Sequence, residues 1–203
     1  MSRHIWLLDP GHGGVIQGAY QTRGKRSPPF ADGSVLYEGE FNRDVAHRIK
    51  ALCDAEGIEC ENIVNSEHDV PLATRVARAN TRHAADKRCI FLSIHANAFG
   101  DGVDFNSAHG VSVFHYMTSK KGKTLATALL QHLVQETGLK SRGVQANMEW
   151  ANFYVLRKTH MPAILSENGF MTNLEDATKL TKDDFRQKVA DAHFKFIKEI
   201  ESS

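Results

Sequence analysis

Apolar runs separated by short polar turns predict the strands of this chain. Four runs are rich in Ile, Leu, Val and Phe and stop at turn residues. They cover residues 5–9, 88–95, 111–116 and 163–167. The first closes at Asp9-Pro10 and leads into His12, which glycines enclose on both sides. Each run predicts a buried strand, and the glycines predict that His12 is displayed at a strand end instead of packed.

Apolar residues spaced three or four positions apart predict helices between these strands. The predicted helices begin at Glu38, at Leu72 after Pro71, near Leu125 and near Phe185, with Gly57 and Gly138 as stop signals. Thr181 and Asp184 have the spacing of a capping box for the last helix. Residues 58–64 and 153–156 predict shorter strands, whereas residues 10–37 and 139–152 show no period and predict irregular segments.

Strands that alternate with helices are typical of a mostly parallel, twisted sheet. We therefore expect the α/β class: one domain over residues 1–203, with helices on both faces of the sheet and no second domain. The length is sufficient for a substantial core.

Net charge, apolar stretches and cysteine spacing argue against several classes of protein. The formal net charge of +1 gives no global field for nucleic acid, and no apolar stretch approaches the roughly 20 residues that span a bilayer. Three widely spaced cysteines predict buried free thiols instead of a disulfide framework. The chain begins almost directly with its first strand, so we expect synthesis in the cytoplasm without a signal peptide, unless a leader has been removed. We expect a monomer.

Polar side chains at strand ends suggest the chemistry. His12 and His95 end two predicted strands, Glu167 ends a third, and Glu38 opens the helix after the long loop. The carboxyl ends of parallel strands share one edge of a sheet, so these groups are expected to converge. Two histidines and one carboxylate leave an open position on Zn²⁺, as in catalytic zinc sites, and a further carboxylate can move protons. Spacing alone does not decide whether these residues bind a metal, because no His-Glu-x-x-His motif is present.

Simpler interpretations stand beside this one. His12 could be an idle loop histidine, His95 could cap its own turn, and Glu167 could merely pair with Arg157. The basic residues at 23–26 are either a solvated loop face or a contact for anionic substrate groups. Trp150 and Phe153 either stack on a sugar or pack. Residues 117–124 fit a phosphate-binding loop except that Met117 replaces its first glycine, which makes nucleotide binding the rival function.

Four blocks of sequence, in order, resemble the zinc-dependent N-acetylmuramoyl-L-alanine amidases of the amidase-3 family. They are residues 8–14 (Leu-Asp-Pro-Gly-His-Gly-Gly), Glu38 with Asn42, residues 93–98 (Ser-Ile-His-Ala-Asn-Ala), and residues 162–173 (Pro-Ala-Ile-Leu-Ser-Glu-Asn-Gly-Phe-Met-Thr-Asn). Residues 75–80 and 154–157 also resemble the family. The matching blocks span nearly the whole chain, although the segment between His12 and Glu38 is longer than in many members.

The resemblance implies hydrolysis of the amide that joins N-acetylmuramic acid to L-alanine of the peptidoglycan stem peptide. It implies that His12, Glu38 and His95 bind Zn²⁺ and that Glu167 is the general base and acid. Glu38 is preferred over Glu40 because of its spacing to Asn42. Asn97 and Arg157 are candidate substrate contacts. The alternatives are a wall-binding module without activity and, for context, a phage endolysin or a bacterial remodelling enzyme that acts on the cell wall.

Overall fold

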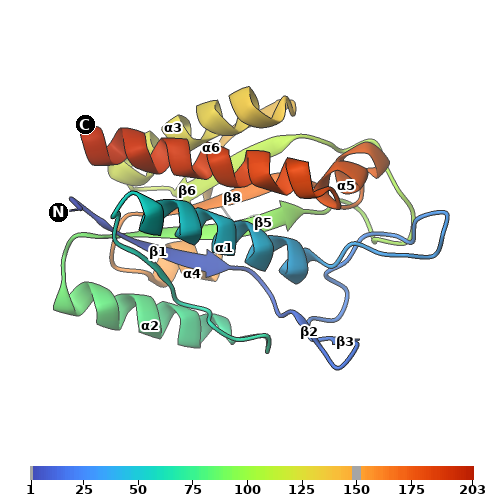
Figure 1. Ribbon diagram of the computed structural model, residues 1–203, viewed down its shortest axis with the longest axis horizontal. Helices are drawn as coiled ribbons and strands as arrows, with labels where there is room; N and C mark the ends of the chain where they lie inside the picture. The colour runs from blue at the N-terminus through green and yellow to red at the C-terminus, as the bar shows by residue number, and fades with distance from the viewer. Residues whose placement is uncertain (1, 148–151) are drawn as a thin grey trace.

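The computed structural model describes residues 2–147 and 152–203, and in these residues a central sheet lies between two layers of helices (Figure 1). The sheet consists of β1 (Ile5–Pro10), β4 (Cys60–Asn62), β5 (Cys89–Asn97), β6 (Val111–Tyr116), β7 (Ser141–Asn147) and β8 (Ala163–Phe170), in the order β4-β1-β5-β8-β6-β7. Strands β4, β1, β5 and β8 are mutually parallel, while β6 and β7 run antiparallel to β8. The α/β fold with a mostly parallel sheet is confirmed.

Each face of the sheet has its own hydrophobic core, because successive side chains of a strand point to opposite faces. In β1, Trp6 and Leu8 belong to one buried cluster, whereas Ile5 and Leu7 belong to the other. The first cluster packs against α1 (Glu38–Ala55), α3 (Lys120–Thr137) and α6 (Asp183–Ser202), and the second against α2 (Leu72–Ala85) and α4 (Tyr154–Lys158). This two-sided burial fixes the strand register and therefore the direction of the polar residues at the strand ends.

Several predicted elements need correction. Residues 141–147 form the edge strand β7, although they were expected to be irregular, and the predicted strand at 153–156 is instead the start of the short helix α4. The long segment before Glu38 contains a small hairpin, β2 (Val15–Ile16) with β3 (Ala19–Tyr20). The predicted strand at 58–64 is reduced to β4.

The capping box predicted for the last helix is also wrong. Residues 174–180 form a further helix, α5 (Leu174–Leu180), and Thr181 is its C-terminal cap. The Thr181 hydroxyl donates to the carbonyl oxygen of Thr178, so it is turned away from α6, which begins after Lys182 without a side-chain cap.

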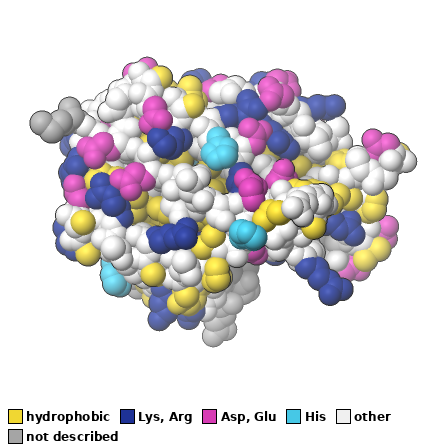
Figure 2. All heavy atoms as spheres, turned by 60° about the horizontal axis from the view of Figure 1, so that its bottom comes forward, with side chains coloured by type: hydrophobic (Ala, Val, Ile, Leu, Met, Phe, Trp, Pro, Cys, Tyr) yellow, Lys and Arg dark blue, Asp and Glu magenta, His cyan; other side chains and the backbone are white. Residues whose placement is uncertain are grey.

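Figure 2 shows acidic and basic side chains interspersed over the face that it displays, without a patch of one charge. Among the described residues, no helix combines the length and apolar character that a membrane span requires.

Candidate metal centre

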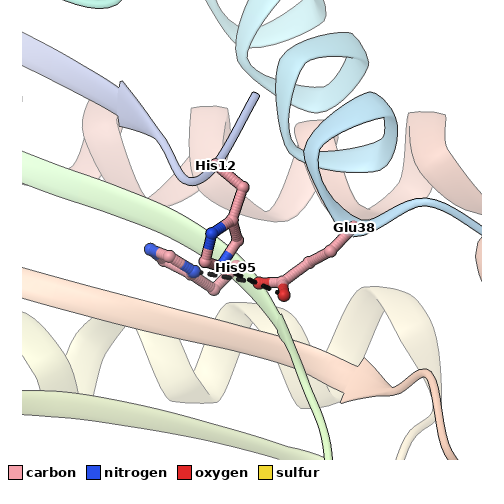
Figure 3. Close-up of side chains that lie close together, drawn as sticks. All are labelled: His12, Glu38 and His95. Carbon is pink, nitrogen blue, oxygen red and sulfur yellow. Dashed lines mark hydrogen bonds and ion pairs between the residues drawn. The ribbon is translucent and has the colours of Figure 1, made fainter. Parts of the chain in front are cut away.

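His12, Glu38 and His95 come from separate elements and point toward one another (Figure 3). His12 follows β1 and His95 lies on β5, and these two strands are parallel neighbours. Glu38 is the first residue of α1. Its carboxylate contacts both rings: Oε2 lies 3.1 Å from Nε2 of His12, and Oε1 lies 2.9 Å from Nδ1 of His95. The structure thus brings together three residues that the sequence proposed as ligands.

The donor set fits a transition-metal ion. One ligand atom from each of the three residues lies within 4.8 Å of the other two. Ligands about 2.0–2.2 Å from a tetrahedral zinc ion are separated by about 3.3–3.6 Å, so only a small adjustment is needed. Glu38 is 3% exposed in its side chain, which excludes a simple solvated carboxylate. Among the described residues, this is the cluster of three or more His, Cys, Asp or Glu side chains that could hold a metal.

The electrostatics at His12 and Glu38 favour the protonation states that a metal requires, whereas the attraction of Glu38 raises the pKa of His95 against its burial. Burial lowers the pKa of His12 and so favours the neutral imidazole, which is the ligand form. Burial alone would raise the pKa of Glu38, but hydrogen bonds and attraction from His12 and His95 outweigh it and hold that pKa well below its ordinary value. Glu38 is therefore ionised at neutral pH.

The turn that carries His12 tolerates little change. His12 has a φ of 66°, in the left-handed region that non-glycine residues rarely adopt. A Cβ at Gly11 would lie 2.1 Å from Cε1 of His95, and one at Gly13 would lie 2.6 Å from Cβ of Gln21. Gly11 and Gly13 are thus required by close packing, whereas the left-handed conformation of the turn falls on His12 itself.

A buried arginine holds this turn from below. Arg75 is 1% exposed, and its Nη1 donates to Asp9 Oδ1 at 2.9 Å and to the carbonyl of Pro10 at 2.6 Å. Its Nη2 donates to the carbonyl of His12 at 3.0 Å, and its Nε to that of Val70 at 2.7 Å. The position of His12 therefore depends on a guanidinium that sequence reasoning did not single out.

Glu167 faces the cluster from the neighbouring strand. It pairs in register with His95 across β5 and β8 and is 7% exposed. Within the described residues its Oε2 has no hydrogen-bond partner. Burial, reinforced by the negative charge of Glu38, raises the pKa of Glu167 to about 8, against smaller opposing effects of His95 and Lys25. A buried carboxyl with such a pKa is typical of a catalytic acid or base.

Glu40, the other candidate ligand in α1, is directed elsewhere. Its Oε1 accepts a hydrogen bond from the backbone N–H of Val15 at 3.0 Å. It therefore supports the hairpin side of the long loop, while Glu38 lies in the cluster. The geometry supports the choice of Glu38 that its spacing to Asn42 suggested.

A cavity of about 690 Å³ opens beside the cluster. His12, Glu38, His95 and Glu167 line it; other lining residues are Thr22, Lys25, Asp69, Leu72, Asn97, Phe153, Tyr154 and Met171. Of the two candidate substrate contacts, Asn97 lines this cavity and Arg157 does not. Arg157 is exposed on α4, with its guanidinium over the ring of Tyr154 at 5.7 Å.

Of the two candidate sugar-stacking residues, Phe153 and Trp150, only Phe153 belongs to the part of the chain that the structure describes. Phe153 lines the cavity and also packs edge-on against Phe114, with ring centroids 4.9 Å apart. Trp150 lies outside the described residues.

The rival phosphate-binding segment is the start of a helix. Gly122 and Lys123, which would supply amides to a phosphate, already donate their backbone N–H groups to the hydroxyl and carbonyl of Ser119 at 3.0 Å each. Ser119 is the N-cap of α3, so the segment forms no phosphate-cradling loop. Nucleotide binding here is not supported.

Comparison with known families decides the classification. The family model described as N-acetylmuramoyl-L-alanine amidase, Amidase_3, matches residues 7–199. The chain belongs to this family. The family resemblance and the expected class, a hydrolase of peptidoglycan amides, are confirmed.

Curated relatives agree with this assignment. The chain is 31% identical to the uncharacterized protein YqiI of Bacillus subtilis over 91% of this chain and 79% of YqiI. It is 32% identical to the N-acetylmuramoyl-L-alanine amidase LytC of the same organism, covering 92% of this chain and 33% of LytC. The endolysin of Bacillus phage SPP1 is 32% identical, with 98% of this chain and 66% of the endolysin covered. The chain thus spans only about a third of LytC.

Solved structures share the fold over the whole chain. The catalytic domain of the amidase CwlV from Bacillus (Paenibacillus) polymyxa var. colistinus has a TM-score of 0.76 and 26% identity, covering 98% of both chains. The amidase AmiC2 of Nostoc punctiforme has a TM-score of 0.76 and 28% identity, covering 99% of this chain and 98% of AmiC2.

Proposed function

We propose that this chain is a zinc-dependent amidase that cleaves the bond between N-acetylmuramic acid and the L-alanine of the stem peptide. The observation that carries the proposal is the position of Glu167, a buried carboxyl placed in register with His95 at the edge of a three-residue ligand cluster. Membership of the amidase family indicates which bond is cleaved. The preference for Zn²⁺ is supported by the two imidazoles and one carboxylate, a set found in catalytic zinc sites.

In this mechanism His12, Glu38 and His95 hold the ion. The ion, when bound, supplies Lewis acidity toward the scissile carbonyl and the attacking water. Glu167 accepts a proton from that water and delivers it to the leaving nitrogen of L-alanine. Its buried position keeps bulk water from competing for the proton. Its raised pKa, which a nearby cation would lower toward neutrality, suits a group that must both accept and release a proton.

Mass spectrometry of digested cell wall tests the reaction. We expect free stem peptides that begin with L-alanine, and we expect them to disappear when a chelator is added. Cleavage within the glycan strands or at peptide cross-links would contradict the proposal.

A wall-binding module without activity is the competing function. The Glu167→Gln variant separates the two, because it should bind Zn²⁺ and wall but lose about 100-fold or more in rate, as removal of a general base does. Glu175→Gln, which changes an exposed carboxylate on α5, serves as the control and should keep the parent rate. Equal rates for both variants and the parent would contradict the role of Glu167.

The route to the wall is a further proposal. Relatives of equal identity include a phage endolysin and a bacterial amidase, so kinship does not choose between lysis and remodelling. We favour lysin-like action by a monomer. Expression in the cytoplasm of a susceptible bacterium should then cause lysis only after the inner membrane is permeabilised, and lysis without permeabilisation would contradict this route.

A further inference from the structure

The residues that line the cavity include one exposed cation, Lys25. It belongs to the long segment between His12 and Glu38, whose role the sequence left open. The backbone of Lys25 is anchored next to the metal centre, because its carbonyl accepts the N–H of Glu38 at 3.0 Å and its own N–H donates to Thr22 at 3.3 Å. The next residue, Arg26, forms a bridge with Tyr37. The root of the Lys25 side chain is thus fixed relative to Glu38.

The other charged groups of the cavity are already neutralised within the protein. Asp69 accepts from the hydroxyl of Thr22 at 2.7 Å and lies 3.4 Å from Nη2 of Arg75. Arg75 is buried and also pairs with Asp9. Glu38 is shared by the two histidines. In the described part of the chain, no hydrogen bond or ion pair is recorded for the ammonium group of Lys25, whereas Lys50 and Lys179 each pair with a carboxylate.

The charge of Lys25 reaches the reactive groups. Lys25 lines the same cavity as His12 and Glu167, and its positive charge acts to lower the pKa of both groups. A cation on the cavity wall that is free to form a pair would attract an anionic group of a substrate bound in the cavity.

The substrate has carboxylates on only one side of the scissile bond. The sugar and the lactyl group are neutral, while the stem peptide carries carboxylates beyond L-alanine. We propose that Lys25 forms a subsite for the stem-peptide carboxylate nearest to L-alanine and makes the enzyme prefer a free carboxylate there over an amidated one. This inference rests on the proposed amidase function and deepens it.

The test compares two soluble muropeptides that differ only at that group, one with the free carboxylate and one with its amide. The quantity measured is the ratio of kcat/KM for the acid to kcat/KM for the amide. We expect Lys25→Gln to lower this ratio by about twofold to fivefold, the range for a solvent-exposed charge pair. Lys25→Glu should lower it further, because it places a negative charge at the subsite.

Arg23→Gln is the matched control. It removes one positive charge from the same exposed loop, at a residue that does not line the cavity, and should leave the ratio as in the parent. The preference of the parent should also weaken as salt is raised, since screening acts on exposed charges. Lysine and arginine at these exposed positions contribute no core packing, so all three variants are expected to fold.

The outcomes distinguish a failure of the Lys25 subsite from a failure of the proposed amidase function. Cleavage of both muropeptides with the same ratio in the parent and in Lys25→Gln would overturn the subsite and leave the amidase function standing. An equal fall of the ratio in Arg23→Gln would also overturn it, because general charge would then explain the effect. If the parent released no stem peptide from either compound, the proposed function would fall and the subsite with it.

Discussion

At the scale of single residues, the environment of Glu167 has a consequence for the stability of the protein. In the folded protein its pKa is about 8, well above the ordinary value of 4.5, mainly because the carboxyl is buried. The folded state therefore keeps a proton that the unfolded chain has lost between about pH 4.5 and pH 8. A proton held preferentially by the folded state makes stability fall as pH rises through this window.

We therefore expect metal-free protein to lose stability between pH 5 and pH 8, and metal-free Glu167→Gln to lose less. The difference between the two should approach about 1.4 kcal/mol for each pH unit over which one proton is involved. Denaturant unfolding at several pH values measures it. Against its burial, the pKa of His95 is also raised, first by the hydrogen bond and attraction of Glu38 and less by Glu167. Glu38 is present in both proteins, so the comparison cancels most of the contribution of His95. Parallel pH profiles for parent and variant would contradict the assigned environment.

At the scale of elements, α2 positions the turn after β1. Arg75 of α2 contacts the carbonyls of Pro10 and His12 and the carboxylate of Asp9. A change at this residue should therefore alter the position of His12 in the candidate metal site. The same carboxylate of Asp9 accepts from the hydroxyl of Ser93 at 2.7 Å, which ties β1 to β5 just before His95. One ion pair thus braces both histidine-bearing segments.

Arg75→Lys keeps the charge but loses most of the fixed donors of the guanidinium. We expect it to weaken Zn²⁺ binding by about tenfold, the size of effect seen for groups that orient metal ligands, and to lower stability by about 2–4 kcal/mol. Chelator competition and denaturant unfolding measure the two effects. Arg78→Lys in the same helix is the control, since Arg78 makes one hydrogen bond, to the carbonyl of Ile63. A normal zinc affinity in Arg75→Lys would show that the turn holds without it.

The elements also show which features sequence can reveal. Buried strands and amphipathic helices were predictable because two-sided or one-sided burial leaves a clear apolar period, as in β1 and α1. β7 pairs only with β6 at the edge of the sheet, so its residues need not be apolar, and Val144 is its one large aliphatic side chain. In α4, Val155 and Leu156 are buried beside other apolar residues, and such a short run resembles a strand.

The candidate site was predictable only where its residues follow a clear apolar period. His12, His95 and Glu167 follow apolar runs, so parallel-strand geometry alone indicated that they converge. Arg75 gave no such signal, because an arginine in a helix rich in Ala and Arg is expected at the surface. Its burial depends on contacts with Asp9 and backbone carbonyls that only the folded chain creates. The cavity-facing position of Lys25 likewise depends on a loop without any sequence period.

At the scale of the whole molecule, a bound ion would join β1, α1 and β5 at one point. A ligand that binds only the folded state stabilises it, by about 2.7 kcal/mol at a hundredfold excess over Kd. For a chain of this length we expect Zn²⁺ to raise the Tm of stripped protein by about 5–10 °C. Calorimetry with and without chelator measures the shift.

The His12→Gln variant should show little of that shift. His68→Gln, which changes an exposed histidine outside the cluster, should show all of it. A full shift in His12→Gln would mean that the ion binds elsewhere.

The two ends of the chain meet on the side remote from the cavity. Glu201, near the end of α6, accepts hydrogen bonds from the backbone N–H of Arg3 and from the indole of Trp6 at 2.6 and 2.9 Å, beside the start of β1 (Figure 1). His12 and the other cluster residues lie past the opposite, carboxyl end of that strand. A polypeptide fused to either terminus would therefore emerge on the side away from the cavity and would leave its opening accessible. This arrangement allows further domains to be joined at either end without a change in the residues around the candidate site.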